Sequence, residues 1–175
     1  PALLAGRTIA VAQDAAFCFI YQANIDMLRA LGAQVVFFSP LQNQPLPACD
    51  AVWLPGGYPE LHAQALQAAS ATRAGIAEHI AHNKPLWAEC GGMLALMESV
   101  QLKDGSTHAL WGIVPGHVHM QPRLAALGSQ QVDLDIGTLR GHTFHYSRTS
   151  TALPVVAHSH RPTSPDPIEA VYQQG

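Results

Sequence analysis

A cysteine followed by two glycines separates two apolar runs in the segment PLWAECGGMLAL. The first run is predicted to be a buried strand and the second a helix. A side chain at such a strand-to-helix turn points into the crevice where open α/β sheets bind ligands. Free N–H groups at the start of the helix, Gly91 among them, would lower the thiol pKa and hold an oxyanion. We therefore predict that Cys90 is a nucleophile, whereas Cys18 and Cys49 are expected to be small buried residues.

A second glycine turn, in LPGGYPELHA, follows another predicted parallel strand. Parallel strands end at one edge of a sheet, so Gly56 and Gly57 are expected beside Cys90. Backbone N–H groups of this turn would complete an oxyanion hole, although two glycines are also typical of an ordinary strand-to-helix loop. Glu60 is expected either to bind the substrate or to stabilise the turn. Neighbours on a strand point to opposite faces, so Glu89 is expected to make a structural hydrogen bond.

The elements that would position these residues alternate between strand and helix in the first half of the chain. Apolar runs predict strands at residues 7–12, 34–38, 51–54 and 85–89. Helical spacing of apolar residues is found at 19–31, 59–69, 72–81 and 92–97. This alternation indicates an α/β fold with a mostly parallel central sheet and helices on both faces.

The second half of the chain has strands without helices between them. They are predicted at residues 117–121, 131–134, 139–146 and 154–158, with a last strand that begins near Ile168 as the chain ends. We expect these strands to form an antiparallel extension of the sheet.

Composition excludes several classes of protein. The 175 residues are 48% hydrophobic and 12% charged, with a formal net charge of −3, which indicates one domain over residues 1–175 with some surface covered by a partner. No basic run suggests nucleic acid, and no apolar run approaches the roughly 20 residues of a membrane span. Three scattered cysteines are too few for a disulfide framework, so we expect a reducing cytoplasm. The histidines lack metal-ligand spacing with carboxylates or cysteines, so no metal is expected.

Five segments together resemble a known family. In chain order they are VAQDAAFCFIYQANIDMLRALGAQVVFFSPL, LPGGYPELHAQAL, PLWAECGGMLAL, VHMQPRLAALG and LRGHTFHYSRT. They resemble the glutamine amidotransferase domain of cobyrinic acid a,c-diamide synthases, a branch of the class I (cysteine-triad) amidotransferases that includes cobyric acid synthase. The resemblance runs from about Arg7 to Tyr172 and implies a flavodoxin-like sheet.

The resemblance implies that Cys90 attacks the side-chain amide of glutamine, releases ammonia and forms a thioester that water hydrolyses to glutamate. It places the oxyanion against the N–H groups of Gly57 and Gly91. Gly56 and Glu60 would contact glutamine. Gln121 and Arg123, in MQPR, would bind its α-carboxylate and amine, and an arginine fork suits a carboxylate.

The resemblance also implies a partner for the ammonia. A synthetase domain, N-terminal in the same polypeptide, would use ATP and Mg²⁺ to activate the a and c carboxylates of cobyrinic or hydrogenobyrinic acid in cobalamin biosynthesis. The chain has no phosphate-binding loop and begins with proline rather than methionine. We therefore expect the glutaminase part of a longer protein, with no cofactor of its own.

Two residues depart from the family pattern. His145, in GHTFHYS, is the in-chain candidate for the base, but the resemblance places the catalytic histidine in a Tyr-Leu-His-like motif beyond Gly175. Thr143 stands where the family has glutamate. Alternatives therefore stay open: amidation of nickel-sirohydrochlorin or of a cell-wall lipid, a degenerate regulatory or binding domain, or a cysteine hydrolase that acts without a partner.

Overall fold

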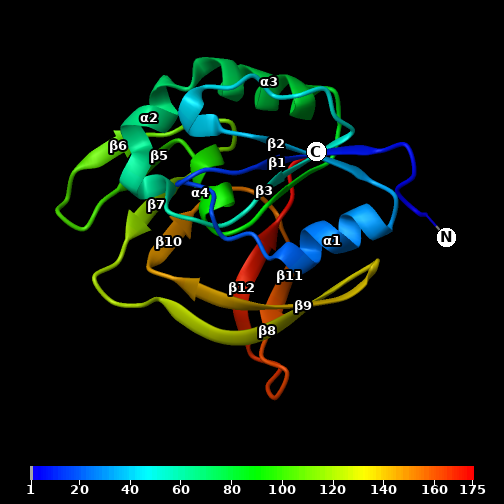
Figure 1. Cartoon of the computed structure of the whole chain (residues 1–175). Coiled ribbons are helices and arrows are strands. Elements are labelled where there is room, and N and C mark those ends of the chain that lie inside the picture. The colour runs from blue at the N-terminus through cyan, green and yellow to red at the C-terminus, as the bar shows by residue number, and fades with distance from the viewer. Residues whose placement is uncertain (1) are drawn as a thin grey trace.

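A four-stranded parallel sheet organises the first half of the chain in a computed structural model, which describes residues 2–175. Its strands have the order β2-β1-β3-β4, and Figure 1 shows β2, β1 and β3 next to one another. They are β1 (Thr8–Ala12), β2 (Gln34–Phe38), β3 (Ala51–Leu54) and β4 (Leu86–Ala88). All four are apolar runs predicted from the sequence, and the α/β class is confirmed.

Helices cover both faces of this sheet, as predicted. They are α1 (Gln22–Ala30), α2 (Ala63–Ala68), α3 (Ser70–Ala81) and α4 (Gly91–Leu96), with 3₁₀ turns η1 (Pro40–Gln42) and η2 (Pro59–His62). Strand side chains alternate between faces. On one face Val11 packs with Ile25 of α1, and on the other Val52 packs with Leu66 of α2 and Ile76 of α3. The helix predicted over 59–69 is divided into η2 and α2. Among residues 2–175, no helix is long and apolar enough to cross a membrane.

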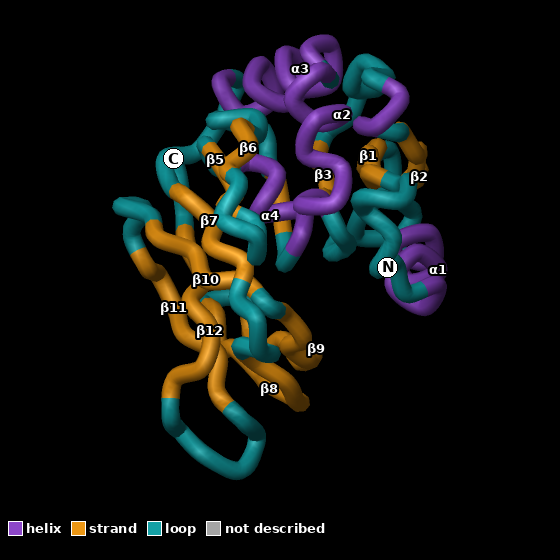
Figure 2. The backbone as a smooth tube through the Cα atoms, turned by 90° about the vertical axis from the view of Figure 1, so that its left-hand side faces the viewer, coloured by secondary structure: helices purple, strands orange, loops and turns teal. Residues whose placement is uncertain are grey.

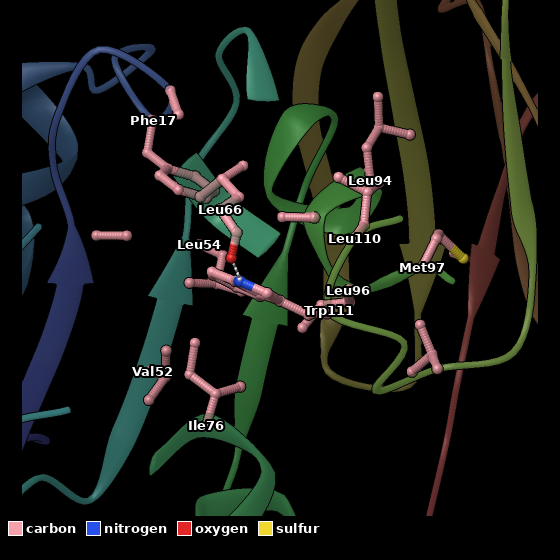
Figure 3. Close-up of a cluster of buried hydrophobic side chains, with 14 of the residues drawn as sticks. Phe17, Val52, Leu54, Leu66, Ile76, Leu94, Leu96, Met97, Leu110 and Trp111 are labelled. Atoms are coloured by element: carbon pink, nitrogen blue, oxygen red, sulfur yellow. Dashed lines mark hydrogen bonds between the residues drawn. The ribbon is translucent and has the colours of Figure 1, made fainter. Parts of the chain in front are cut away.

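Trp111 anchors the larger core (Figure 3). Its ring is fully buried and stacks on Phe17 with 6.1 Å between ring centroids. Its indole Nε1–H donates to the carbonyl of Leu66 over 2.9 Å, so the buried polar atom is satisfied. Leu94 and Leu96 pack in the same cluster, and this core therefore fixes α4, the helix that follows Cys90.

The strands after residue 98 form two further sheets, which differs from the expected extension of the first sheet. One is a mixed sheet of order β10-β7-β5-β6 and the other an antiparallel sheet of order β12-β11-β8-β9. The mixed sheet contains β5 (Ser99–Gln101), β6 (Thr107–Ala109), β7 (His117–Met120) and β10 (Ser147–Ser150). The antiparallel sheet contains β8 (Ala126–Leu134), β9 (Gly137–His145), β11 (Val155–His160) and β12 (Pro167–Tyr172). The strands β5, β6 and β10 were not predicted, because three or four residues carry little periodicity.

The antiparallel sheet curls until its two edge strands meet. Thr143 and His145 on β9 both contact the carboxylate of Glu169 on β12, although these strands lie at opposite edges. Figure 2 shows the curled sheet at the end of the molecule away from α3. The last strand, expected only to begin as the chain ends, pairs along β11 from Pro167 to Tyr172.

Candidate active site

Cys90 occupies a strained turn between β4 and α4, where the sequence placed it. Its backbone has φ 50° and ψ −117°, a region that residues with a side chain avoid. Hydrogen bonds on both sides hold the turn: Glu89 N–H donates to Leu54 O over 3.1 Å, and Leu94 N–H donates to Cys90 O over 3.1 Å. Strain that the surrounding structure enforces in this way is typical of functional residues.

The two predicted oxyanion-hole glycines touch each other beside this cysteine. A Cβ added to Gly91 would lie 2.8 Å from both the N and the O atoms of Gly57, and a Cβ added to Gly57 would lie 2.1 Å from Ala16 O. Neither position has room for a side chain. The N–H groups of both glycines interact with the thiol of Cys90 and stabilise its ionised form. The structure therefore brings together the two glycine turns, which the sequence placed at one sheet edge.

The loop after β1 supports the second glycine turn through its backbone. Phe19 N–H donates to Gly56 O, and Tyr58 N–H donates to Ala16 O, each over 3.0 Å. The ring of Phe19 also covers Gly56, where an added Cβ would lie 3.0 Å from Phe19 Cδ2. Cys18, in the same loop, was expected to be buried, but it is exposed and lines the cavity that contains Cys90.

The environment of Cys90 raises the pKa of its thiol, contrary to the predicted lowering. Although the residue is accessible from a cavity, the largest effect is desolvation by surrounding protein atoms. The N–H groups of Gly91 and Gly57 lower the pKa, as expected, but the charges of Glu60 and Glu89 raise it. The helix terminus alone would lower the pKa of the thiol, but burial and the two carboxylates outweigh it.

Glu60 and Glu89 are held differently around the nucleophile. Glu89 accepts a hydrogen bond from Trp53 Nε1–H over 2.7 Å, which agrees with its predicted structural role. Glu60 lies in η2, and burial raises its pKa, opposed mainly by its own backbone N–H. Burial likewise raises the pKa of Glu89, opposed by the Trp53 hydrogen bond. Both groups therefore place partly desolvated negative charge near Cys90.

His145 lines the same cavity as Cys90, but other groups occupy both of its ring nitrogens. Nε2 lies 2.8 Å from Glu169 Oε1, and Nδ1 lies 3.0 Å from Ser147 O. Two acceptors favour the imidazolium, and the Glu169 hydrogen bond raises the pKa of His145. In this arrangement His145 has no free nitrogen to accept the proton of Cys90.

Glu169 was missed in the sequence. Thr143 Oγ1 donates to Glu169 Oε1 over 2.9 Å, so a carboxylate on β12 lies against the position where the family carries glutamate. Burial alone would raise the pKa of Glu169, but hydrogen bonds to His145 and Thr143 and the His145 charge lower it. The only available signal was an acidic residue in an otherwise apolar last strand.

Gln121 and Arg123 lie in the segment after β7. Gln121 Nε2–H donates to the carbonyl of His119 over 3.2 Å, and Arg123 is exposed. Within the described part of the chain, neither residue lines the Cys90 cavity. Their predicted contact with glutamine stays a prediction.

The cavity that contains Cys90 has a volume of about 1820 Å³, well above the roughly 300–1,000 Å³ of ordinary small-molecule sites. It lies between the parallel sheet and the curled antiparallel sheet and is lined from β4, α4, β9 and β12. Residues 2–175 contain no group of three or more histidine, cysteine or acidic side chains arranged to hold a metal ion.

Residues 8–161 match the family described as the CobB/CobQ-like glutamine amidotransferase domain. The chain belongs to this family. It is 50% identical over 172 residues to the hydrogenobyrinate a,c-diamide synthase of Pseudomonas aeruginosa, and 47% identical over 174 residues to the cobyrinate a,c-diamide synthase of Herminiimonas arsenicoxydans. These matches cover 98% and 99% of the chain but 40% of each relative.

Solved structures agree on the fold of this amidotransferase domain. A glutamine amidotransferase crystal structure superposes with a TM-score of 0.61 at 13% identity, covering 87% of this chain and 84% of the other. The structure of PurLQS from Thermotoga maritima gives a TM-score of 0.56 at 15% identity, covering 87% and 74%. The resemblance found in the sequence is thus confirmed.

Proposed function

We propose that this domain hydrolyses glutamine and supplies the ammonia to a corrin-amidating synthetase. The observation that carries the proposal is the strained Cys90 turn, packed against Gly57 and Gly91, whose N–H groups favour the ionised thiol. Relatives named hydrogenobyrinate and cobyrinate a,c-diamide synthase support a corrinoid substrate. The rest of the enzyme would use ATP and Mg²⁺ to activate the a and c carboxylates.

The proposed chemistry begins when the Cys90 thiolate attacks the side-chain carbonyl of glutamine. The carbonyl electron pair moves onto oxygen, and the N–H groups of Gly57 and Gly91 stabilise that oxyanion. When the carbonyl re-forms, the C–N bond breaks and the nitrogen takes a proton, which releases ammonia. Water then adds to the γ-glutamyl thioester, and cleavage of its C–S bond yields glutamate and the thiolate.

The base in this scheme is proposed to be a histidine other than His145. The occupied ring nitrogens of His145 support this assignment, and so does the raised pKa of Cys90, because an adjacent imidazolium would be needed to offset Glu60 and Glu89. His145 would instead stabilise the curled sheet. Three cysteines without disulfides are consistent with a cytoplasmic enzyme.

The test compares nitrogen donors in the full-length enzyme. Cys90→Ser is expected to abolish glutamine-dependent amidation and to leave ammonia-dependent amidation intact, because only the first requires the thiol. Loss of both activities in a folded variant would contradict the division of labour. Hydrogenobyrinic acid and nickel-sirohydrochlorin, offered in parallel, would distinguish the two amidation reactions.

Intact mass after incubation with 6-diazo-5-oxo-norleucine tests glutamine recognition separately. One adduct that maps to Cys90 is expected. The absence of an adduct in the folded full-length enzyme would favour a regulatory domain that no longer processes glutamine.

A further inference from the structure

Two histidines share the solvent-facing side of β7. Side chains at positions i and i+2 of a strand point to the same face of a sheet. His117 and His119 are both exposed, whereas Val118 between them is 1% exposed and packs in the larger core. Among residues 2–175, neither histidine lines the Cys90 cavity. The pair is therefore a group of ligands separate from the proposed glutaminase site.

The neighbouring strand β5 holds both rings in the same way. The two strands pair in parallel, with Ser99 opposite His117 and Gln101 opposite His119. His119 Nδ1 lies 3.1 Å from Gln101 Oε1, and His117 Nδ1 lies 2.9 Å from Ser99 Oγ. An amide oxygen only accepts, so His119 carries its proton on Nδ1 and a lone pair on Nε2. The Ser99 hydroxyl can accept from His117 in the same sense, which leaves a lone pair on the second Nε2.

This arrangement has the features of a histidine metal site. A metal-bound histidine donates its other ring nitrogen to a neighbouring acceptor, which fixes the tautomer and the orientation of the ring. Neutral imidazole is a ligand for Zn²⁺, Ni²⁺ and Cu²⁺, whereas Mg²⁺ and Ca²⁺ prefer oxygen. Residues two apart on a strand are about 6.6 Å apart, so both rings can reach one ion at the ~2.0–2.1 Å of a zinc–imidazole bond.

A second histidine pair shows that spacing alone is not sufficient. His158 and His160 also lie two residues apart, on β11. His160 Nδ1 lies 3.0 Å from Arg161 O, and its Nε2 lies 3.3 Å from Asp133 Oδ2. Two acceptors leave this ring without a lone pair for a metal. Of these two pairs, only the one on β7 offers both Nε2 atoms.

The charges beside the β7 pair differ in sign. Glu98 Oε2 lies 3.5 Å from His117 Nε2 and accepts a hydrogen bond from Gly116 N–H over 3.0 Å, so this carboxylate would attract a bound cation. Arg148, opposite His119 on β10, would oppose it. Among residues 2–175, no third histidine, cysteine or carboxylate is arranged with the pair to hold an ion. Solvent would fill the other positions, and we expect weaker binding than at a closed four-ligand zinc site.

We propose that His117 and His119 form a binding site for a divalent transition-metal ion, with Zn²⁺ as the expected ion. Zinc accepts imidazole and water together in a tetrahedral shell. The sequence predicted no metal here, because the support from β5 exists only in the folded chain. The site shares no residue with the proposed glutaminase site, so the two proposals stand or fall separately.

The test maps histidine carbethoxylation by diethyl pyrocarbonate in the full-length enzyme, with and without zinc chloride. The reagent acylates a free imidazole nitrogen, and a bound metal ion blocks that nitrogen. His82 is the internal control. It is exposed at the end of α3, and its Nδ1 lies 2.8 Å from Glu78 O, so it offers a single ring with the same kind of support.

Zinc should slow the modification of His117 and His119 over the same range of concentration and leave His82 unchanged. In His119→Gln, protection of His117 should require zinc concentrations on the order of 10²-fold higher, because the remaining ring binds without a chelate partner. Absent protection, protection of only one ring of the pair, or equal protection of His82 would overturn the proposal. So would unchanged protection of His117 in His119→Gln.

Gln101→Leu tests the support from β5 in the same assay. The zinc concentration for half-protection should rise about tenfold, because the proton of His119 is no longer held on Nδ1. Thr107→Val is the matched control, since Thr107 is exposed on β6 directly opposite Gln101, and it should keep the wild-type value. An unchanged value in Gln101→Leu would contradict a site built by this strand pair.

Discussion

Replacing Gly57 by alanine tests whether close packing of the glycine turn holds the proposed oxyanion donor in place. The added Cβ would lie 2.1 Å from Ala16 O, about 1 Å below the 3.0 Å under which real Cβ contacts essentially never fall. Ala16 O also accepts the hydrogen bond from Tyr58 N–H, so the turn cannot retreat without weakening that bond. We expect the turn to move by about 1 Å and to carry the Gly57 N–H away from Cys90.

This displacement should lower both the rate of glutamine hydrolysis and the melting temperature. Misplacement by about 1 Å costs on the order of 10²-fold in rate, and loss of one oxyanion donor costs ~10²–10³-fold, so glutamine hydrolysis should fall by about 10²-fold. Overpacking costs ~1–3 kcal/mol and the weakened hydrogen bond ~1 kcal/mol. For a domain of this size the melting temperature should fall by roughly 4–16 °C.

The assay measures glutamate release and thermal unfolding of Gly57→Ala in the full-length enzyme. Gly141→Ala is the matched control, because Gly141 lines the same cavity and a Cβ added there meets nothing within 4 Å. The control should resemble the wild type in both measurements. If Gly57→Ala also kept the wild-type rate and melting temperature, the packing argument for this turn would be refuted.

Three further changes probe charge and packing. Glu169→Gln should lower the melting temperature most between about pH 4.5 and 6.5, the ordinary pKa values of the pair. The raised pKa of His145 stabilises the fold at low pH, and this stabilisation is lost as the pH rises through the pKa of the folded state. The lowered pKa of Glu169 stabilises the fold at high pH, and this stabilisation is lost as the pH falls through its folded-state pKa. A difference in melting temperature between wild type and variant that does not change with pH would contradict the ion pair. Glu89→Gln should lower the pKa of Cys90, seen as an alkylation-rate profile shifted to lower pH, because one nearby negative charge is removed; an unshifted profile would show that the carboxylate does not act on the thiol. Trp111→Phe should lower the free energy of unfolding by about 0.5–1.5 kcal/mol in denaturant titrations, because the carbonyl of Leu66 loses one of its two donors and keeps only Ala69 N–H. Wild-type stability would show that the Ala69 N–H alone satisfies this carbonyl.

The parallel half of the fold was predictable because its strands are apolar runs that end at glycine or proline. Residues 34–38 and 51–54 were assigned with the observed bounds of β2 and β3. The same regularity placed Cys90 at the turn after β4, since parallel strands end at a common edge. The order of strands and helices along the chain was therefore enough to predict where Cys90 lies.

The rest depended on contacts that sequence spacing does not encode. The pKa of Cys90 depends on burial and on Glu60 and Glu89, which become its neighbours only in the folded chain. The pairing of His145 with Glu169 requires a sheet that curls until its edges meet. Short strands such as β5 gave no signal, because their pairing with β6 and β7 depends on partners elsewhere in the chain.

The two hydrogen bonds between the loop after β1 and the glycine turn join main-chain atoms only. No side-chain chemistry is needed to make them, so a substitution of the exposed Phe19 would leave the link between the loops intact. The support of the nucleophile therefore depends on main-chain geometry and on the glycines packed beside it, rather than on particular polar side chains. Transplanting this site into another scaffold would require both loops together, as one cassette.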